Sequence, residues 1–501
     1  MAIAPACFAL DPESRGTLQQ RIRQMVAGAI LSGRISPGER MPSTRGLASY
    51  LGISRITVTL AYGELVADDF LQARGRSGYF VSSSAAPAPM RPLPAPRTGE
   101  GVGEGVDWTR ALGPRAESPL GYAKPADWRS YRFPFIYGQA DPALFDHQSW
   151  RACTLRAVGQ RDFPAMSDDS FEADDPKLVE YIARHSLPRR GILARPQEIL
   201  VTMGAQNALW LAAQLLLNQR RVAGIEDPGY PGLRAILGQT RCRVRPVTVG
   251  PHGLDPETLP RGLDVLFCTP SHHCPTGATM PLAARRALLR RAEAEGMLVV
   301  EDDYEFELTA EGAALPALKA LDRSDRVIHV GSCTKSLFPG LRLGYLVGAE
   351  PFIREARALR ASVLRHPPGL IQRAAAYFLS LGHHDAMLRR LSTAFRQRRQ
   401  VMLEAVAQVG LDPAGPTPAQ GGSSLWLCAP AGVDTMEMAQ RLRAQGVLIE
   451  PGAPFFQGPE VPTGFFRIAY SSIPAERIPE GIARIAHAMQ APPPTNCDGP
   501  D

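Results

Sequence analysis

A segment of low complexity divides the chain in two. Sixteen of the 24 residues from Ser82 to Gly105 are Pro, Gly, Ser or Ala, and no apolar periodicity runs through them. This composition cannot bury a core and is typical of a partly extended linker. We therefore predict a small domain over residues 1–81, a linker over residues 82–130, a large domain over residues 131–490 and a tail over residues 491–501.

Composition excludes several classes of protein. The 501 residues are enough for two or three domains, and the net charge of +6 is too small to indicate nucleic-acid binding without a local motif. The eight cysteines show neither a C-x-x-C pair nor a Cys/His metal spacing, which predicts a reducing compartment and no metal site. Since no apolar run is long enough to cross a bilayer, we expect a cytoplasmic protein with no membrane partner.

The small domain has the pattern of three helices followed by a hairpin. Apolar residues recur at helical spacing from Leu18 to Ile30. Ser43 and Ser54 stand where they can cap two further helices, which Gly52 separates by a tight turn. This arrangement predicts a helix-turn-helix. A basic glycine turn over residues 74–78 then lies between two short β-type runs.

Hydroxyl and arginine side chains gather at the two helix starts and in the hairpin turn. Helix N-termini and arginines bind phosphates, and a helix in the major groove reads bases. A small helical bundle without a ligand fits the same pattern. The candidate DNA-binding residues are Ser43, Thr44, Arg45, Ser54, Arg55, Thr57 and Arg76.

This segment resembles the winged helix-turn-helix of the GntR family. The resemblance is carried by GRISPGERMPSTR from Gly33 to Arg45 and by LGISR from Leu51 to Arg55. It implies that double-stranded operator DNA is a partner.

Short apolar runs alternate with longer helical stretches in the large domain. Continuous apolar strands between helices predict an α/β fold with a mostly parallel sheet that is covered on both faces. From about Gln397 the pattern changes to a smaller α+β subdomain. The predicted strands cover residues 199–202, 221–225, 265–267, 297–300, 327–330, 424–427 and 465–468.

A lysine and an arginine follow one of the predicted strands at a fixed spacing. Lys335 comes after the run at 327–330 within Ser-x-x-Lys, and Arg342 follows within Gly-x-Arg-x-Gly. A desolvated lysine has a lowered pKa and can attack an aldehyde, and an arginine offers a planar fork to a phosphate. The alternative is a surface lysine in a turn, but the two motifs together are more specific than a lone lysine would be.

Three further strand ends carry candidate groups. Asp302 and Tyr304 follow an apolar strand, where a carboxylate could keep a cofactor's ring nitrogen protonated, bind a metal or cap a helix. Residues 204–206 join a strand to a helix. Backbone N–H groups at such a junction can bind a phosphate, but a plain polar turn explains the same residues. Tyr230 could stack on a flat ring or pack in the core.

Together these segments, from about Phe133 to Met489, resemble the fold-type I aminotransferases, which bind pyridoxal 5′-phosphate. The resemblance implies that Lys335 forms the Schiff base with the cofactor, that Asp302 pairs with the pyridine nitrogen and that Tyr304 pairs with the ring hydroxyl. Tyr230 would stack on the ring, and Arg467 matches the arginine that binds a substrate carboxylate. The residues expected around the phosphate are Gly204, Ala205, Gln206, Ser332 and Arg342.

One departure from the aminotransferase pattern affects the expected activity. The family has Asn-Pro-x-Gly where this chain has Cys274-Pro275-Thr276-Gly277. The change removes a hydrogen bond to the cofactor, and we predict that His273 takes the place of the asparagine.

The order of a GntR-like winged helix, a linker and an aminotransferase-like domain resembles the MocR/PdxR regulators. It implies a PLP-dependent regulator in which an amino acid or amine effector displaces Lys335, and a head-to-tail homodimer. We expect a sensor rather than an enzyme. A working aminotransferase with a DNA-binding domain, and a vitamin B6 compound as effector, remain alternatives.

Overall fold

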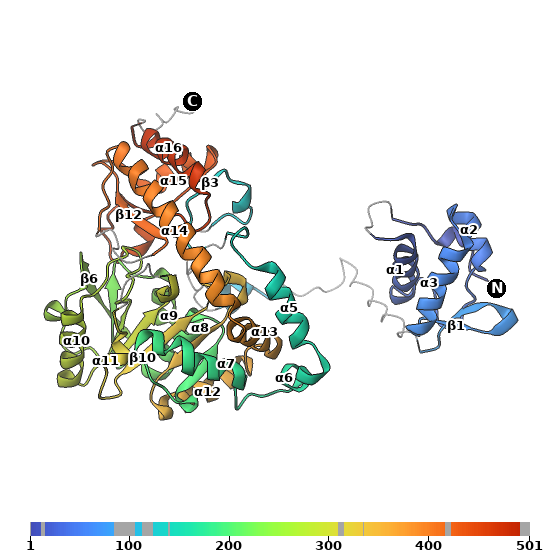
Figure 1. The fold of residues 1–501 in the computed structure, drawn as a ribbon, viewed down its shortest axis with the longest axis horizontal. Helices are drawn as coiled ribbons and strands as arrows, with labels where there is room; N and C mark the ends of the chain where they lie inside the picture. Colours follow the sequence, from blue (N-terminus) through green and yellow to red (C-terminus); the bar gives the residue numbers. More distant parts are fainter. Residues whose placement is uncertain are drawn as a thin grey trace. The chain divides into compact units, whose positions relative to one another are not determined.

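The chain folds into two compact units, Met1–Gly113 and Pro114–Asp501, in a computed structural model (Figure 1). The structure describes residues 2–11, 16–84, 106–112, 124–138, 141–308, 315–333, 335–415 and 422–490. Most of the predicted linker and the whole predicted tail lie outside these residues. None of the helices in the described ranges combines the length and apolar composition that a membrane span requires.

The first unit contains the predicted helix-turn-helix and hairpin. Its helices are α1 (Leu18–Leu31), α2 (Thr44–Leu51) and α3 (Arg55–Ala67), and the antiparallel pair β1 (Leu71–Ala73) and β2 (Tyr79–Val81) follows them. The short helix α4 (Trp108–Ala111) lies beyond the hairpin. Apolar residues from every element except α4 form one core, so this unit has its own hydrophobic interior.

Local capping fixes where the two helices of the motif begin. The Ser43 hydroxyl accepts the Gly46 N–H at 3.0 Å, and the Ser54 hydroxyl accepts the Ile56 N–H at 3.3 Å. Gly52 ends α2 with φ of +68°, a conformation that costs glycine little. These contacts explain why the sequence signals placed the turn correctly.

An eight-stranded sheet forms the centre of the second unit, in the order β4-β11-β10-β9-β8-β5-β6-β7. Five consecutive strands of that order, from β10 to β6, run parallel, and β11 and β7 run antiparallel to their neighbours. The strands are β4 (Ile199–Thr202), β5 (Val222–Asp227), β6 (Arg243–Gly250), β7 (Gly253–Leu254), β8 (Val265–Cys268), β9 (Leu298–Asp303), β10 (Val327–Ser332) and β11 (Gly344–Val347).

Helices pack on both faces of this sheet. On one face the core includes α8 (Ala205–Leu216), α9 (Pro231–Thr240) and α12 (Glu350–Leu364). On the other face, side chains of α10 (Leu282–Glu295) and α11 (Leu318–Leu321) pack at one end, and a larger cluster lies at the other. That cluster includes residues of α5 (His147–Ala157), α7 (Pro176–Tyr181), α13 (Gly369–Ser380) and α14 (His383–Gln408). Val299 and Val300 belong to opposite faces, as strand alternation requires.

A smaller α+β part follows α14. Its antiparallel sheet has the order β12-β15-β14, and a separate parallel pair joins β13 to β3. These strands are β12 (Ser424–Cys428), β13 (Val447–Leu448), β14 (Glu450–Pro451), β15 (Phe465–Ala469) and β3 (Phe133–Pro134). The remaining α-helices in the described part of the unit are α6 (Phe163–Ser167), α15 (Thr435–Ala444) and α16 (Ile478–Gln490).

The structure adds elements that the sequence pattern did not predict. Strand β6 reads RVRPVTVG and is largely exposed, so it lacks the continuous apolar run of a buried strand. Strand β11 has four residues and begins at Gly344, the last residue of the Arg342 motif. Residues 124–130, which we assigned to the linker, pack with the second unit, since Trp128 is 4% exposed beside Ile136 and Leu448. The domain boundaries themselves stay predictions.

Candidate functional site

One cavity of about 300 Å³ collects most of the predicted site residues of the second unit. Its walls come from the carboxyl ends of β9 and β10, the N-termini of α8 and α9, and the strands β14 and β15. Ligands of open α/β sheets bind at this edge. The predicted residues that line it are Ala205, Gln206, Tyr230, Asp302, Tyr304, Ser332, Lys335, Arg342 and Arg467.

Lys335 lies in this cavity beside an aromatic ring. Its Nζ is 4.0 Å from the centre of the Tyr137 ring. Enclosure by protein lowers the pKa of Lys335 to about 8, which gives it a larger neutral fraction than an ordinary lysine has. Gly138 makes this position possible, because a Cβ there would lie 2.0 Å from Lys335 Nζ and the residue has φ of +71°.

Asp302 offers an unpaired carboxylate oxygen to the cavity. Its Oδ1 is buried and has no hydrogen-bond partner among the described residues. Burial, followed by the neighbouring Asp303 carboxylate, raises the pKa of Asp302 to about 7. A ligand with a basic ring nitrogen would supply the missing partner.

The N-terminus of α8 and Arg342 form an anion-binding end. Gly204 caps α8 with φ of +81°, and a Cβ there would lie 3.4 Å from Arg342 Nη2. Arg342 donates to the Met203 carbonyl at 3.3 Å. Free N–H groups at a helix start, together with a guanidinium, suit a phosphate.

Arg467 already has an acidic partner at the other end of the cavity. Its Nε donates to Glu450 Oε2 at 2.7 Å, and the two residues face each other across β14 and β15. Its guanidinium carbon lies 4.1 Å from the centre of the Tyr137 ring and 4.8 Å from that of Phe455. Burial opposes the charge, but Glu450, Cys274 and Tyr137 together outweigh burial and raise the pKa of Arg467.

The sequence reasoning missed several groups of this site. Tyr137, Glu450 and Lys124 line the cavity, although no motif marked them. Glu305 lies buried behind Tyr137 and accepts its hydroxyl at 3.0 Å. The Ser423 hydroxyl donates to the same carboxylate at 2.5 Å.

The structure does not bring His273 to the cavity. Its Nδ1 is 2.7 Å from the Thr276 hydroxyl and its Nε2 is 3.6 Å from Glu226 Oε2. Burial and the adjacent His272 lower the pKa of His273 to about 3. Cys274 lines the cavity instead, and burial raises the pKa of its thiol to about 11. The prediction that His273 replaces the missing asparagine therefore has no geometric support.

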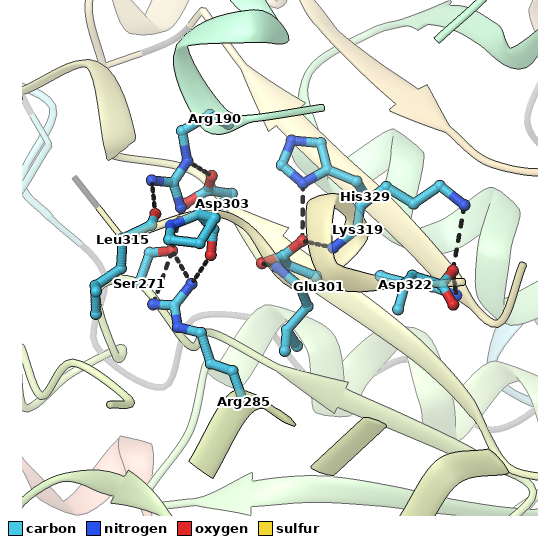
Figure 2. Close-up of polar contacts among 12 residues, drawn as sticks. Arg190, Ser271, Arg285, Glu301, Asp303, Leu315, Lys319, Asp322 and His329 are labelled. Carbon is cyan, nitrogen blue, oxygen red and sulfur yellow. Dashed lines mark hydrogen bonds and ion pairs between the residues drawn. The ribbon is translucent and has the colours of Figure 1, made fainter. Parts of the chain in front are cut away.

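A buried polar network holds the end of β9 beside the cavity (Figure 2). Arg190 donates to Asp303 at 2.6 Å, to the Ser271 hydroxyl at 2.6 Å and to the Leu315 carbonyl at 2.7 Å. Glu301 interacts with His329 Nδ1 at 3.1 Å and accepts two N–H groups of α11. Since side chains alternate along a strand, fixing Glu301 and Asp303 on one face directs Asp302 to the other.

The candidate DNA-binding residues lie at the helix starts and in the hairpin turn. Arg45, Arg55 and Arg76 are exposed, whereas Thr44 and Thr57 are half-buried. Ser43 and Ser54 cap their helices, so their hydroxyls already have a structural role. Ile56 and Leu60, which were not predicted, are exposed on α3.

Two family profiles match the chain. "Bacterial regulatory proteins, gntR family" matches residues 18–81, and "Aminotransferase class I and II" matches residues 172–485. Among relatives, the HTH-type transcriptional regulator TauR of Rhodobacter capsulatus is 57% identical over 98% of this chain and 100% of its own. The pyridoxine biosynthesis transcriptional regulator PdxR of Corynebacterium glutamicum is 30% identical over 81% of this chain and 83% of its own.

Solved structures agree with the fold of the second unit. LysN, an α-aminoadipate aminotransferase of Thermus thermophilus complexed with N-(5′-phosphopyridoxyl)-L-leucine, matches with a TM-score of 0.68 at 26% identity. The match covers 77% of this chain and 98% of LysN.

The fold and the cavity define a DNA-binding protein with a fold-type I domain for pyridoxal 5′-phosphate. The unpaired Asp302 oxygen, the anion-binding start of α8 and the enclosed Lys335 fit that cofactor. The chain belongs to the MocR/PdxR group of GntR-family transcriptional regulators, which carry an aminotransferase-like domain.

Proposed function

We propose that the second unit senses an amino compound through Lys335 and thereby controls the DNA affinity of the first unit. The observation that carries the proposal is the joint presence of Lys335, the unpaired Asp302 and Arg467 in one cavity. Pyridoxal 5′-phosphate, when bound, supplies an aldehyde that bonds covalently to an amine. An amine that entered the cavity would compete with Lys335 for that bond.

Each cavity residue has a role in this proposal. Asp302 would hold a proton on the ring nitrogen of the bound cofactor, Tyr304 would hydrogen-bond its ring hydroxyl, and Tyr230 would stack on the ring. Arg467 binds an anionic group of the effector. The residues that would bind the phosphate are Gly204, Ala205, Gln206, Ser332 and Arg342.

In the first unit, Arg45, Arg55 and Arg76 are the exposed cations that would contact operator DNA. Thr44 and Thr57 would add hydrogen bonds, and Ser43 and Ser54 would act by holding the two helix starts. We place the protein in the cytoplasm, where the DNA is, and propose the head-to-tail homodimer that the resemblance implies. Sedimentation analysis tests the dimer.

We propose a sensor rather than an efficient aminotransferase, because Cys274 stands where aminotransferases have asparagine. A protein that converts the amino compound with a keto-acid acceptor, without any change in DNA binding, would be the aminotransferase alternative. A response to a vitamin B6 compound in the absence of any amine would favour the vitamer alternative.

Borohydride reduction followed by intact-mass measurement tests the role of Lys335. The wild-type protein should gain the mass of the cofactor, and Lys335→Ala should not. Lys177→Ala, an exposed lysine on α7, is the matched control and should behave as wild type. An effective amine, added before reduction, should remove the gain. Retention of the gain in Lys335→Ala, or with every amine tested, would contradict the proposal.

A further inference from the structure

Tyr137 lines the cavity and contacts two residues of the proposed function, yet it has no role of its own there. Its ring centre lies 4.0 Å from Lys335 Nζ and 4.1 Å from the guanidinium carbon of Arg467. The negative face of an aromatic ring attracts a cation at such distances. The ring is therefore a contact that Lys335 has inside the cavity besides any ligand.

A buried carboxylate fixes the Tyr137 ring. The Tyr137 hydroxyl donates to Glu305 Oε2 at 3.0 Å, and the Ser423 hydroxyl donates to Oε1 at 2.5 Å. His272 Nε2 lies 3.1 Å from the same Oε2, and Glu305 is 4% exposed. Burial, followed by Glu305, raises the pKa of Tyr137 and keeps its hydroxyl a donor. Glu305 thus directs the ring toward Lys335.

An amine that displaces Lys335 creates a buried cation. The lysine side chain is tethered after β10, so its Nζ stays in the cavity. Burial opposes a charge on Nζ most strongly and Arg467 adds repulsion, whereas the Glu305 and Glu450 carboxylates favour the charge. Glu305 has the larger effect of the two, and Glu450 is already bonded to Arg467 Nε.

We propose that the Tyr137 ring and the Glu305 carboxylate stabilise the Lys335 ammonium when an amine displaces it, and so set how readily the cavity responds to its effector. The carbon–nitrogen double bond to Nζ breaks as one to the effector nitrogen forms. The two protons that an ammonium effector loses pass to Nζ. Glu305 acts through its charge and by positioning Tyr137. This inference rests on the proposed function, since it concerns how Lys335 is displaced.

The test titrates n-butylamine into the full-length, cofactor-loaded protein at pH 7.0 and pH 9.5. This probe has no anionic group, so its binding does not depend on a salt bridge to Arg467. The measurement is the concentration that halves the cofactor mass retained after borohydride reduction. The variants are Tyr137→Leu, Tyr137→Phe and Glu305→Gln, and the controls are Tyr131→Leu and Glu307→Gln.

The two controls match the changed residues in kind but face away from Lys335. Tyr131 is half-buried, does not line the cavity and accepts from Arg443 Nε at 3.1 Å through its hydroxyl. Glu307 lies two residues after Glu305, and its Oε2 is 3.7 Å from His384 Nε2. Retention of the cofactor without amine shows that each variant is folded.

We expect Tyr137→Leu and Glu305→Gln to raise the half-release concentration about fivefold at pH 7.0, because each removes a group that stabilises charged Lys335. At pH 9.5, above the Lys335 pKa of about 8, the released lysine is neutral, and both variants should match wild type. Tyr137→Phe keeps the ring and should lie between wild type and Tyr137→Leu. The controls should match wild type at both pH values.

The comparison at equal pH cancels the titration of the other groups of the cavity, which include Tyr230, Cys274, Asp302, Tyr304 and Glu450. An equal rise at both pH values would overturn the inference, because a general disturbance of the cavity acts on neutral and charged lysine alike. So would wild-type values in both Tyr137→Leu and Glu305→Gln at pH 7.0, or an equal rise in the controls. If n-butylamine never releases Lys335 from the wild type, the proposed function fails together with the inference, and this result is distinct from the other three.

Discussion

At the residue scale, strand alternation gives three adjacent acids different surroundings. Glu301 and Asp303 face the network of Arg190 and His329, whereas Asp302 faces the cavity with an unpaired oxygen. These acids could be located from the sequence, because they directly follow the apolar run at residues 297–300. The partners that the fold brings from distant positions, such as Arg190, cannot be found from local pattern.

Asp302 should make the stability of the cofactor-free protein depend on pH. The pKa of Asp302 is raised to about 7 in the folded protein, against about 3.9 in an unfolded chain. Between these values the folded state binds more protons, so the free energy of unfolding falls as pH rises, by at most about 1.4 kcal/mol per pH unit. Asp302→Asn removes this contribution and should flatten the decline.

Urea unfolding at pH 5 and pH 7 measures this difference between wild type and Asp302→Asn. Glu226→Gln should also flatten the decline, because burial raises the pKa of Glu226 to about 7. Identical slopes in the wild type and both variants would show that neither carboxyl is protonated in the folded protein.

At the element scale, helix starts that are set by local capping were predictable from the sequence, whereas the strands β6 and β11 were not. The helix starts at Ser43 and Ser54 follow from side-chain capping, which depends on three or four adjacent residues. Strand β6 lies between β5 and the two-residue edge strand β7 and has few buried residues, and β11 pairs antiparallel between β4 and β10. Their positions depend on neighbours that are distant in sequence.

Substitutions of the adjacent residues Ser54 and Arg55 should have different effects, the first on stability and the second on DNA binding. Ser54→Ala removes the cap of α3 and should lower the free energy of unfolding of the first unit by about 1 kcal/mol. Arg55→Ala, an exposed position, should leave stability unchanged and weaken operator binding by about 1 to 3 kcal/mol.

Thermal unfolding and DNA titration of both variants measure the two effects. Arg23→Ala is the control, because Arg23 pairs with Asp68 beyond the other end of α3. Equal loss of DNA affinity in Arg23→Ala and Arg55→Ala would show that α3 does not present its start to the DNA.

At the scale of the whole molecule, the composition break at Ser82 falls between the two family matches, which cover residues 18–81 and 172–485, whereas the two compact units divide after Gly113. The cavity residues Lys335 and Asp302 were found because each follows an apolar strand in a local motif, and Arg467 was found through the resemblance to the aminotransferases. Lys124 and Glu450 were not, because they reach the cavity through the packing of Trp128 and the register of β14 with β15.

The central claim is that occupancy of the cavity and DNA binding are coupled. The measurement is the affinity for operator DNA, selected from a random library with the wild-type protein, with and without an amine that releases Lys335. We predict a change of roughly 5- to 150-fold, an equal change in amine affinity when DNA is present, and neither change in Lys335→Ala. An amine that releases Lys335 completely and leaves operator affinity unaltered would contradict the account.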